Sequence, residues 1–402
     1  MSFKFRYLYV GMFSVCFFSA SAIVSAAEWK SEPTVLLKSQ YNDNVRMRAD
    51  ELKEGSTGFT LEPRIKFAGE EQRLWDVAID TRARITRYQD IGDGDSENLF
   101  FNFDGGRQTE LTDWRLNANY SRNTNFDTDF ETVNPDSSLG DRTERATTTI
   151  APSVRWNTSE TSQVSFSLNT TQVTYGEVSR FNYRDYDNDS LSFIAYWMLA
   201  ENHQLGFTSS YSKYDSPSAN FSYEQSVLQL DYTHNITPTS DVKISLGGRS
   251  LDSLSTSIFG DFRNKDTGVV TNVTYSSQSE LVSHRFTGGR TVSPSSFGGA
   301  SEILDATYQF SIKNTERLTT KLILNASDSS TVNGTASSRR NDRFSYRVEP
   351  SVSYRLTKNW NLQFLYRHIN QDYTNNINVG ERASNAIYIN LFLHWPKLVT
   401  TY

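Results

Sequence analysis

The feature of this sequence that most limits its fold is a two-residue alternation of apolar and hydrophilic side chains. From Val348 to His368 the chain reads VEPSVSYRLTKNWNLQFLYRH, in which a polar break at 357–359 separates two alternating arms. Successive side chains of a β-strand point to opposite faces, so each arm predicts a strand with one apolar and one hydrophilic face. The pattern recurs from residue 59 to residue 395 without a comparable helical period. It predicts about eighteen strands, each near the roughly 9–11 residues of a tilted membrane strand.

The connections between the expected strands alternate between short and long. Short ones lie near 69–72, 109–112, 157–161, 200–203, 236–240, 314–317 and 357–359, and long polar ones near 42–56, 88–97, 123–144, 176–188, 252–267, 328–342 and 373–383. A transmembrane barrel has short periplasmic turns and longer outer loops, whereas a soluble β-sandwich has no reason to sort its loops in this way. The sequence therefore predicts an all-β fold, a transmembrane antiparallel up-and-down β-barrel over residues 28–402, with both termini in the periplasm.

The tryptophans indicate where the membrane boundary lies. Five are within a few residues of a short connection and one is near the C-terminus: Trp75, Trp114, Trp156, Trp197, Trp360 and Trp395. An indole prefers the membrane–water boundary because its ring is apolar and its N–H needs a polar partner. These residues are expected to form one aromatic girdle at the periplasmic rim. The apolar strand face then contacts lipid and the hydrophilic face lines the interior, which explains a mean hydropathy of only −0.55.

The N-terminal residues predict export. Lys4 and Arg6 precede an apolar run from Tyr7 to about Ile23, and small residues at 25–27 offer a cleavage site. This pattern is typical of a secretory signal peptide, here residues 1–27, with a true membrane anchor as the alternative. The only cysteine, Cys16, lies inside this run, so the mature chain has no thiol for a disulfide or a metal. The expected location is the outer membrane of a Gram-negative bacterium, in contact with membrane lipid and lipopolysaccharide.

The sequence shows no arrangement of residues for catalysis. The five histidines, His203, His234, His284, His368 and His394, have no metal-ligand spacing and no recognisable acid–base partner. No serine has the setting of a nucleophile elbow. A net charge of −6 gives no basic footprint for nucleic acid. We therefore expect a protein that is not an enzyme, with no cofactor, no metal site and no nucleic-acid partner.

Charged residues recur in the phase that faces the interior. They are Glu62, Arg64, Lys66, Asp80, Arg82, Arg84, Arg115, Arg155, Arg347, Glu349, Arg355 and Arg367. One interpretation is a pore lining that selects solutes by charge, in which the cations of the early strands favour anions. The other is internal pairing of arginines with carboxylates, which would hold adjacent strands together. Both can hold if some cations remain unpaired.

Two local motifs suggest a family. Proline recurs in the same phase of three similar strands, LEPRIKF, IAPSVRW and VEPSVSY, where it is expected to cause a local bulge or an unpaired carbonyl. The first strand ends in Tyr41-Asn42-Asp43-Asn44-Val45, before Arg46 and Arg48. Together these features resemble the "beta-barrel porin 2" proteins, which include outer-membrane barrels found with exopolysaccharide and exosortase (PEP-CTERM) systems. Tyr41, Asp43 and Asn44 match the family pattern. The resemblance implies an outer-membrane barrel with a role in polymer export, and it supplies no catalytic residues.

Two functional classes remain open. The first is a porin-like channel or export conduit for a hydrophilic solute, such as an anionic or neutral polysaccharide, with periplasmic export components as partners; about eighteen strands enclose water unless something plugs them. The second is a structural or adhesive barrel whose acidic outer loops bind lipopolysaccharide, cations or a surface polymer. The carboxylates that suit the second class are Asp127, Asp129, Glu131, Asp136, Asp141, Asp185, Asp187 and Asp189.

Overall fold

The structure, a computed structural model, describes residues 28–71, 74–91, 94–124, 143–176, 183–257, 260–295, 298–334, 342–373 and 381–401. The expected signal peptide and the acidic residues between 127 and 141 lie outside these ranges. The strands are β1 (Glu28–Asn42), β2 (Ser56–Glu71), β3 (Trp75–Tyr88), β4 (Ser96–Gln108), β5 (Thr112–Thr124), β6 (Glu144–Asn157), β7 (Ser162–Tyr175), β8 (Tyr186–Ala200), β9 (His203–Ser216), β10 (Phe221–Thr237), β11 (Ser240–Ser257), β12 (Gly260–Gln278), β13 (Val282–Ser295), β14 (Gly299–Lys313), β15 (Leu318–Gly334), β16 (Arg343–Arg355), β17 (Trp360–Tyr373), β18 (Glu381–His394) and β19 (Leu398–Thr401).

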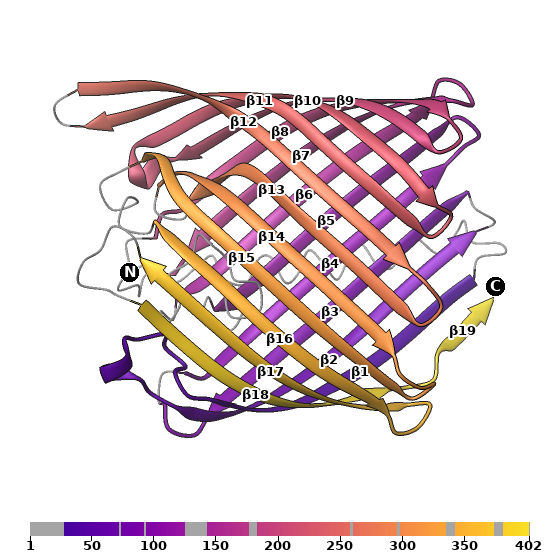
Figure 1. The fold of residues 1–402 in the computed structure, drawn as a ribbon, viewed down its shortest axis with the longest axis vertical. Helices are drawn as coiled ribbons and strands as arrows, with labels where there is room; N and C mark the ends of the chain where they lie inside the picture. The colour runs from indigo at the N-terminus through magenta and orange to yellow at the C-terminus, as the bar shows by residue number, and fades with distance from the viewer. Residues whose placement is uncertain are drawn as a thin grey trace, which may run out of the picture.

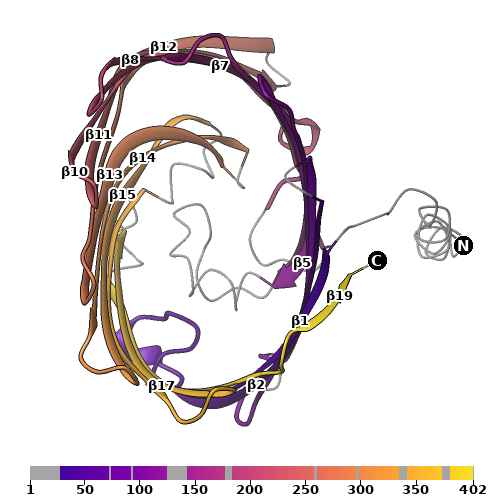
Figure 2. The ribbon, with the colours of Figure 1, turned by 90° about the vertical axis from the view of Figure 1, so that its right-hand side faces the viewer.

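These strands form a closed barrel. Each strand from β1 to β17 pairs in antiparallel fashion with the next along the chain, and β1 also pairs with β18, which closes the sheet (Figures 1 and 2). The short β19 pairs with the first residues of β1 and continues the line of β18. The predicted antiparallel barrel of about eighteen strands is confirmed.

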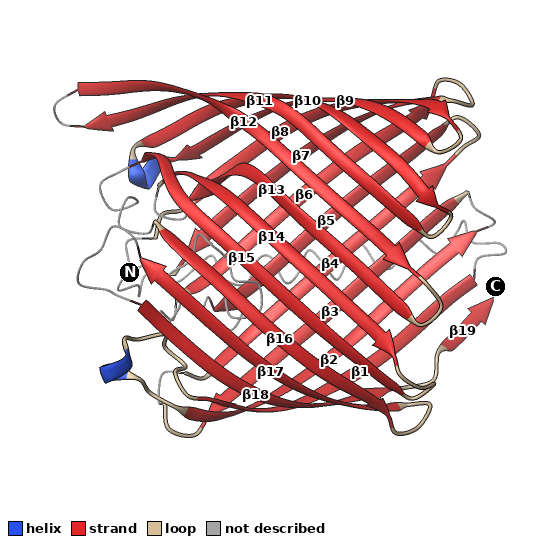
Figure 3. Cartoon of the chain, viewed as in Figure 1, coloured by secondary structure: helices blue, strands red, loops and turns tan. Residues whose placement is uncertain are grey.

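The two ends of the barrel differ as the connection lengths predict. Short turns join the strands at the right-hand end in Figure 1, and the longer connections lie at the left-hand end. The start of β1 and the whole of β19 lie at the short-turn end, because Glu28 pairs with both Thr401 and Glu70. Two single-turn helices, η1 (Asp50–Leu52) and η2 (Pro217–Ala219), lie at the long-loop end and are blue in Figure 3. Within the described ranges, no helix is long and apolar enough to cross a membrane.

The apolar side chains lie on the outside of the wall. In β17, Phe364 and Tyr366 are exposed on the outer face, whereas Arg367 and Gln371 are buried on the inner face. The same alternation leaves a belt of exposed apolar residues around the barrel, among them Leu61, Ile65, Leu116, Ile150, Phe166, Leu168, Leu191, Leu228, Leu230, Ile244, Leu246, Leu304 and Ile389. Exposing such a continuous apolar belt to water would be unfavourable, so lipid is the surrounding medium of this surface.

One expected loop is a hairpin. The polar segment 252–267 was predicted to be a long connection, but β11 runs to Ser257 and β12 begins at Gly260, with a continuous ladder between them. Its outer face carries charge because the strands have risen beyond the apolar belt, and Asp252 pairs there with Arg263 at 3.1 Å. The prediction was wrong because a strand that extends beyond the membrane can carry polar residues on both faces, so its sequence shows no apolar–polar alternation.

The three repeated prolines interrupt the sheet on one side only. Pro63, Pro152 and Pro350 have register partners in the preceding strands β1, β5 and β15. On the side of the following strand the ladder skips each proline and the residue before it, then resumes in the same register. The missing proline N–H accounts for the gap. The bulge that we expected is absent, because the register does not shift.

Candidate functional site

The six tryptophans of the expected girdle all lie at the short-turn end. Odd-numbered strands begin and even-numbered strands end at this rim, and each of the six is within a few residues of such a strand end. Trp114 and Trp156 are about half exposed on the outer face. The indole N–H of Trp75 donates to Glu71 at 2.6 Å and that of Trp114 to Thr112 at 3.2 Å. Polar partners on an otherwise apolar surface suit the membrane boundary. Their role as a girdle stays a prediction.

On the inner face of β2 and β3, the cations are paired with carboxylates. Arg64 donates through Nε to Asp80 at 2.7 Å. Glu62, which is buried, accepts from Arg84 at 2.6 Å and lies 3.5 Å from Arg82. The guanidinium of Arg82 also lies 4.2 Å from the centre of the Phe100 ring. These groups connect neighbouring strands across the lumen wall and largely neutralise one another.

The same balance continues through β3 to β6. Arg115 lies 2.6 Å from Asp76, 3.2 Å from Asp104 and 3.3 Å from Asp113. Arg155 shares Asp113 at 3.0 Å. Lys66, by contrast, is exposed on the inner face of β2. The early-strand cations singled out from the sequence are therefore mostly balanced locally, which leaves them little capacity to make the lumen favour anions.

Several arginines lie close together on the inner face of β16–β18, and only some of them were predicted from the sequence. Arg367 donates to Glu349 at 2.6 Å and lies against the Tyr388 ring. Arg355 is exposed near the short turn and donates to the Glu316 carbonyl at 2.7 Å. Arg347 is half-buried on the inner face, on the long-loop side of Glu349.

Two further arginines, Arg343 and Arg382, were missed. Their guanidinium carbons lie 5.9 and 5.0 Å from the centre of one ring, that of Tyr373. Both residues have the interior phase of their strands, which was the signal available in the sequence.

The Tyr41-to-Val45 motif at the end of β1 lies at the seam where the barrel closes. The carboxylate of Asp43 accepts from the backbone N–H of Asn385 at 2.7 Å and from its side-chain amide at 2.8 Å. Asn44, fully buried, donates to the carbonyls of Arg48 and Ala383 at 2.7 and 2.8 Å. The motif thus joins β1 to β18, and Tyr41 is exposed on the outer face.

The segment after this motif, residues 43–55, folds into the lumen. Figure 2 shows this indigo segment, with its short helix, inside the outline of the barrel. Val45 and Met47 are buried there, and Val45 packs with Ile91. Arg46 and Arg48 both pair with Glu54. The length of this polar connection predicted only an outer loop. The buried side chains of Val45 and Met47 hold it inside the lumen instead.

A second inward projection comes from the wall itself. The C-terminal end of β13 and the N-terminal end of β14 leave the sheet and curve into the barrel (Figure 2). We call their described residues, 291–295 and 298–302, the inner hairpin. Ala300 packs there against Tyr214 and Leu251, and all three are fully buried. The hydroxyl of Tyr214 donates to the Ser295 carbonyl at 3.1 Å. The inner hairpin is therefore packed against the inner face of β9–β11.

The ion pair between Arg249 and Glu302 joins the inner hairpin to the wall, and a second pair of Arg249, with Asp266 of β12, lies within the wall. Arg249 of β11 lies 2.8 Å from Glu302 and 2.5 Å from Asp266. Because the hairpin turns away, β12 pairs with β13 only from Thr271 to Gln278, while it pairs with β11 along its whole length. The signal in the sequence was the apolar character of Tyr214 and Leu251, which occupy the interior phase where hydrophilic residues are expected.

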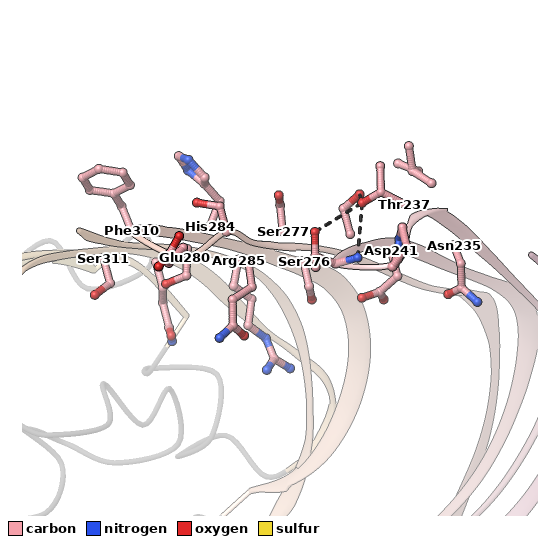
Figure 4. A pocket seen from close by; sticks show the side chains of 18 of the residues that line it. Asn235, Thr237, Asp241, Ser276, Ser277, Glu280, His284, Arg285, Phe310 and Ser311 are labelled. Atoms are coloured by element: carbon pink, nitrogen blue, oxygen red, sulfur yellow. Dashed lines mark hydrogen bonds between the residues drawn. The ribbon is translucent and has the colours of Figure 1, made fainter. Parts of the chain in front are cut away.

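A cavity of about 1480 Å³ lies at the short-turn end, beside β10–β15. In Figure 4, Arg285, Asp241 and Ser311 point to one side of the wall, and His284 and Phe310 point to the other. The first group faces the lumen. Within the described part of the chain, no group of three or more His, Cys, Asp or Glu residues is arranged to hold a metal ion.

Comparisons with known proteins bear on the fold. No protein-family model matches the chain, and no curated protein matches it by sequence. Among solved structures, the ferric citrate transporter FecA in its unliganded form has 9% identity and a TM-score of 0.50, with 91% of this chain and 78% of that chain covered. The chain has the fold of an outer-membrane β-barrel. Pseudomonas aeruginosa OccK2 (OpdF) in complex with glucuronate has 10% identity, a TM-score of 0.49 and coverage of 92% and 98%. A BenF-like porin from Pseudomonas fluorescens Pf-5 has 11% identity, a TM-score of 0.47 and coverage of 91% and 99%.

Proposed function

We propose that this barrel is a porin-like channel of the outer membrane that conducts a hydrophilic solute and assists the export of an exopolysaccharide. The observation that carries the proposal is the inversion of the fold: apolar side chains cover the outside, and hydrophilic ones line the inside. A wall of this many strands encloses more space than side chains fill, which favours a water-filled lumen. The large cavity at the short-turn end agrees with this expectation.

In the part of the chain that the structure describes, two inward projections narrow the path. Residues 43–55 and the inner hairpin both lie toward the long-loop end of the barrel, whereas the cavity lies at the short-turn end. The channel therefore has a wide mouth on the short-turn side and a constriction toward the long loops. Polymer export as a specific task rests on the resemblance of the Tyr41-to-Asn44 motif, which supports it without demanding it.

Conductance in planar lipid bilayers tests the channel. Purified protein should give discrete current steps in potassium chloride, and neutral polymers of increasing size should reduce these steps up to a cut-off set by the constriction. A parent barrel that inserts fully and passes no current contradicts the proposal.

A structural or adhesive barrel is the second candidate, and one observation favours it. The outer faces of β8–β11 carry carboxylates beyond the apolar belt: Asp187, Asp189, Asp215, Glu224 and Asp252. Carboxylates at the level of the lipid head groups can bind divalent cations that lipopolysaccharide also binds. This candidate predicts a silent barrel whose thermal stability depends on calcium in lipopolysaccharide-containing membranes.

A further inference from the structure

The inner face of the barrel is divided into sectors of different charge. On β2–β6 it carries seven cations and six carboxylates: Arg64, Lys66, Arg82, Arg84, Arg115, Arg145 and Arg155 with Glu62, Glu70, Asp76, Asp80, Asp104 and Asp113. On β13–β18 it carries eight cations and two carboxylates: Arg285, Lys313, Lys321, Arg343, Arg347, Arg355, Arg367 and Arg382 with Asp305 and Glu349. The inner face of β7–β9 carries no charged residue.

The two charged sectors therefore have different physical roles. Balanced ion pairs between neighbouring strands stiffen the wall and produce little net potential. An excess of one sign along one wall produces a potential that attracts counter-ions, and low-dielectric walls concentrate it. The cations of β13–β18 extend from the short turns to the long loops, since Arg355 is near one end and Arg343 at the other. We name the inner face of β13–β18 the basic strip.

The short-turn end of the basic strip is accessible. Arg285 and Lys321 are exposed and line the 1480 Å³ cavity. Neither forms an ion pair or a hydrogen bond through its side chain within the described part of the chain. The cavity exceeds the roughly 300–1000 Å³ of ordinary small-ligand sites, so it has room for a chain as well as a single residue of a polymer. Its carboxylates, Glu201, Asp241 and Glu280, come from turns and the start of β11, toward the rim.

The side chains between the two cations carry hydroxyl and amide groups. Gln309 is the register partner of Arg285, and Ser311 is the register partner of Lys321. Ser351 lies opposite Lys321 on the other side. Hydroxyls and amides bind sugar hydroxyls by hydrogen bonds, while the ammonium and guanidinium groups bind carboxylates. Both kinds of donor therefore alternate along a single surface.

We propose that the basic strip is the path of a carboxylate-bearing saccharide chain, and that Arg285 and Lys321 form its first contact at the short-turn mouth. This inference rests on the proposed channel function and names its substrate class. The cations of β2–β6 serve to hold the wall, and the neutral face of β7–β9 completes the opposite side of the path.

The test compares two pairs of substitutions that remove the same charge from the lumen. Arg285→Gln with Lys321→Gln removes two cations from the basic strip, and Lys66→Gln with Arg155→Gln removes two from the balanced sector. All four side chains are exposed, so both variants should insert and conduct. The measurement is the block of single-channel current by oligogalacturonate added from the short-turn side, with a neutral maltooligosaccharide of equal length as the reference.

We expect the parent channel to be blocked by the oligogalacturonate far more strongly than by the neutral chain. The basic-strip variant should lose about tenfold in apparent affinity, as expected for two exposed charge-assisted contacts, and its block should become less sensitive to salt. The balanced-sector variant should change by less than about twofold, because Asp113 keeps Arg115 as its partner.

Other outcomes overturn the inference. Equal losses in both variants would show a diffuse field rather than a path. Equal block by an acidic peptide such as oligoglutamate would show that the basic strip binds any carboxylate-bearing chain, and it would refute the assignment to a saccharide. A parent channel that conducts but is not blocked refutes the basic strip and leaves the proposed channel standing, whereas a parent without conductance refutes the channel itself.

Discussion

Burial, rather than distance, should decide what an ion pair contributes to this barrel. Glu349 and Arg367 face the lumen with a 2.6 Å contact, and their side chains are 11% and 10% exposed. Glu144 and Arg122 on the outer face have a contact of the same length, 2.6 Å, but their side chains are 50% and 54% exposed. At this separation two unit charges attract by about 6 kcal/mol at an effective dielectric constant of about 20, and by about 1.6 kcal/mol in bulk water.

Desolvation offsets much of the larger value, so we expect a coupling energy of about 2–3 kcal/mol for the lumen pair and less than about 1 kcal/mol for the outer pair. A double-mutant cycle measures each: Glu349→Gln and Arg367→Gln singly and together, and Glu144→Gln with Arg122→Gln in the same way. The assay is reversible urea unfolding from lipid vesicles, followed by tryptophan fluorescence. Equal coupling in the two cycles would refute the reasoning, because it would mean that water screens the lumen as well as it screens the surface.

Three more outcomes follow from described contacts. Ala300→Glu should expel the inner hairpin, since Ala300 is fully buried, and single-channel conductance should rise; an unchanged conductance would place the constriction elsewhere. Asp43→Ala should lower the free energy of unfolding by about 1–3 kcal/mol because Asn385 loses two acceptor contacts, whereas Asp50→Ala, whose side chain is 78% exposed, should change it by less than about 0.5 kcal/mol. Trp114 as the only remaining tryptophan should be quenched most by lipids brominated near the carbonyl group, and strongest quenching at the bilayer centre would contradict the girdle.

The barrel was predictable because its signal is local. Alternation along each strand fixes which side chains face outward, so Leu116 and Phe364 could be assigned to the outer face without any knowledge of their neighbours. Ion pairing between neighbouring strands on the inner face was not predictable in this way. Whether Arg64 meets Asp80, and whether Arg84 meets Glu62, depends on the register between strands, which no local pattern encodes.

The departures from the alternation contained information that the sequence reading passed over. Tyr214 and Leu251 are apolar in the interior phase, and an apolar group facing a watery lumen needs another surface to cover it. The inner hairpin supplies that surface. Its position could not be derived from the sequence, because a strand that bends inward keeps the same alternation as one that stays in the wall.

The early exit of β13 from the wall also makes the barrel mechanically uneven. Its seam with β12 holds eight register pairs, from Thr271 to Gln278, whereas β12 is bound to β11 along its whole length. A closed sheet subjected to heat or to lateral tension separates first along its shortest ladder. The amide protons of β12 that face β13 should exchange with solvent earliest in residues 260–270, which precede the paired segment. An unfolding barrel should open at this seam into a sheet whose new edges are β12 and β13.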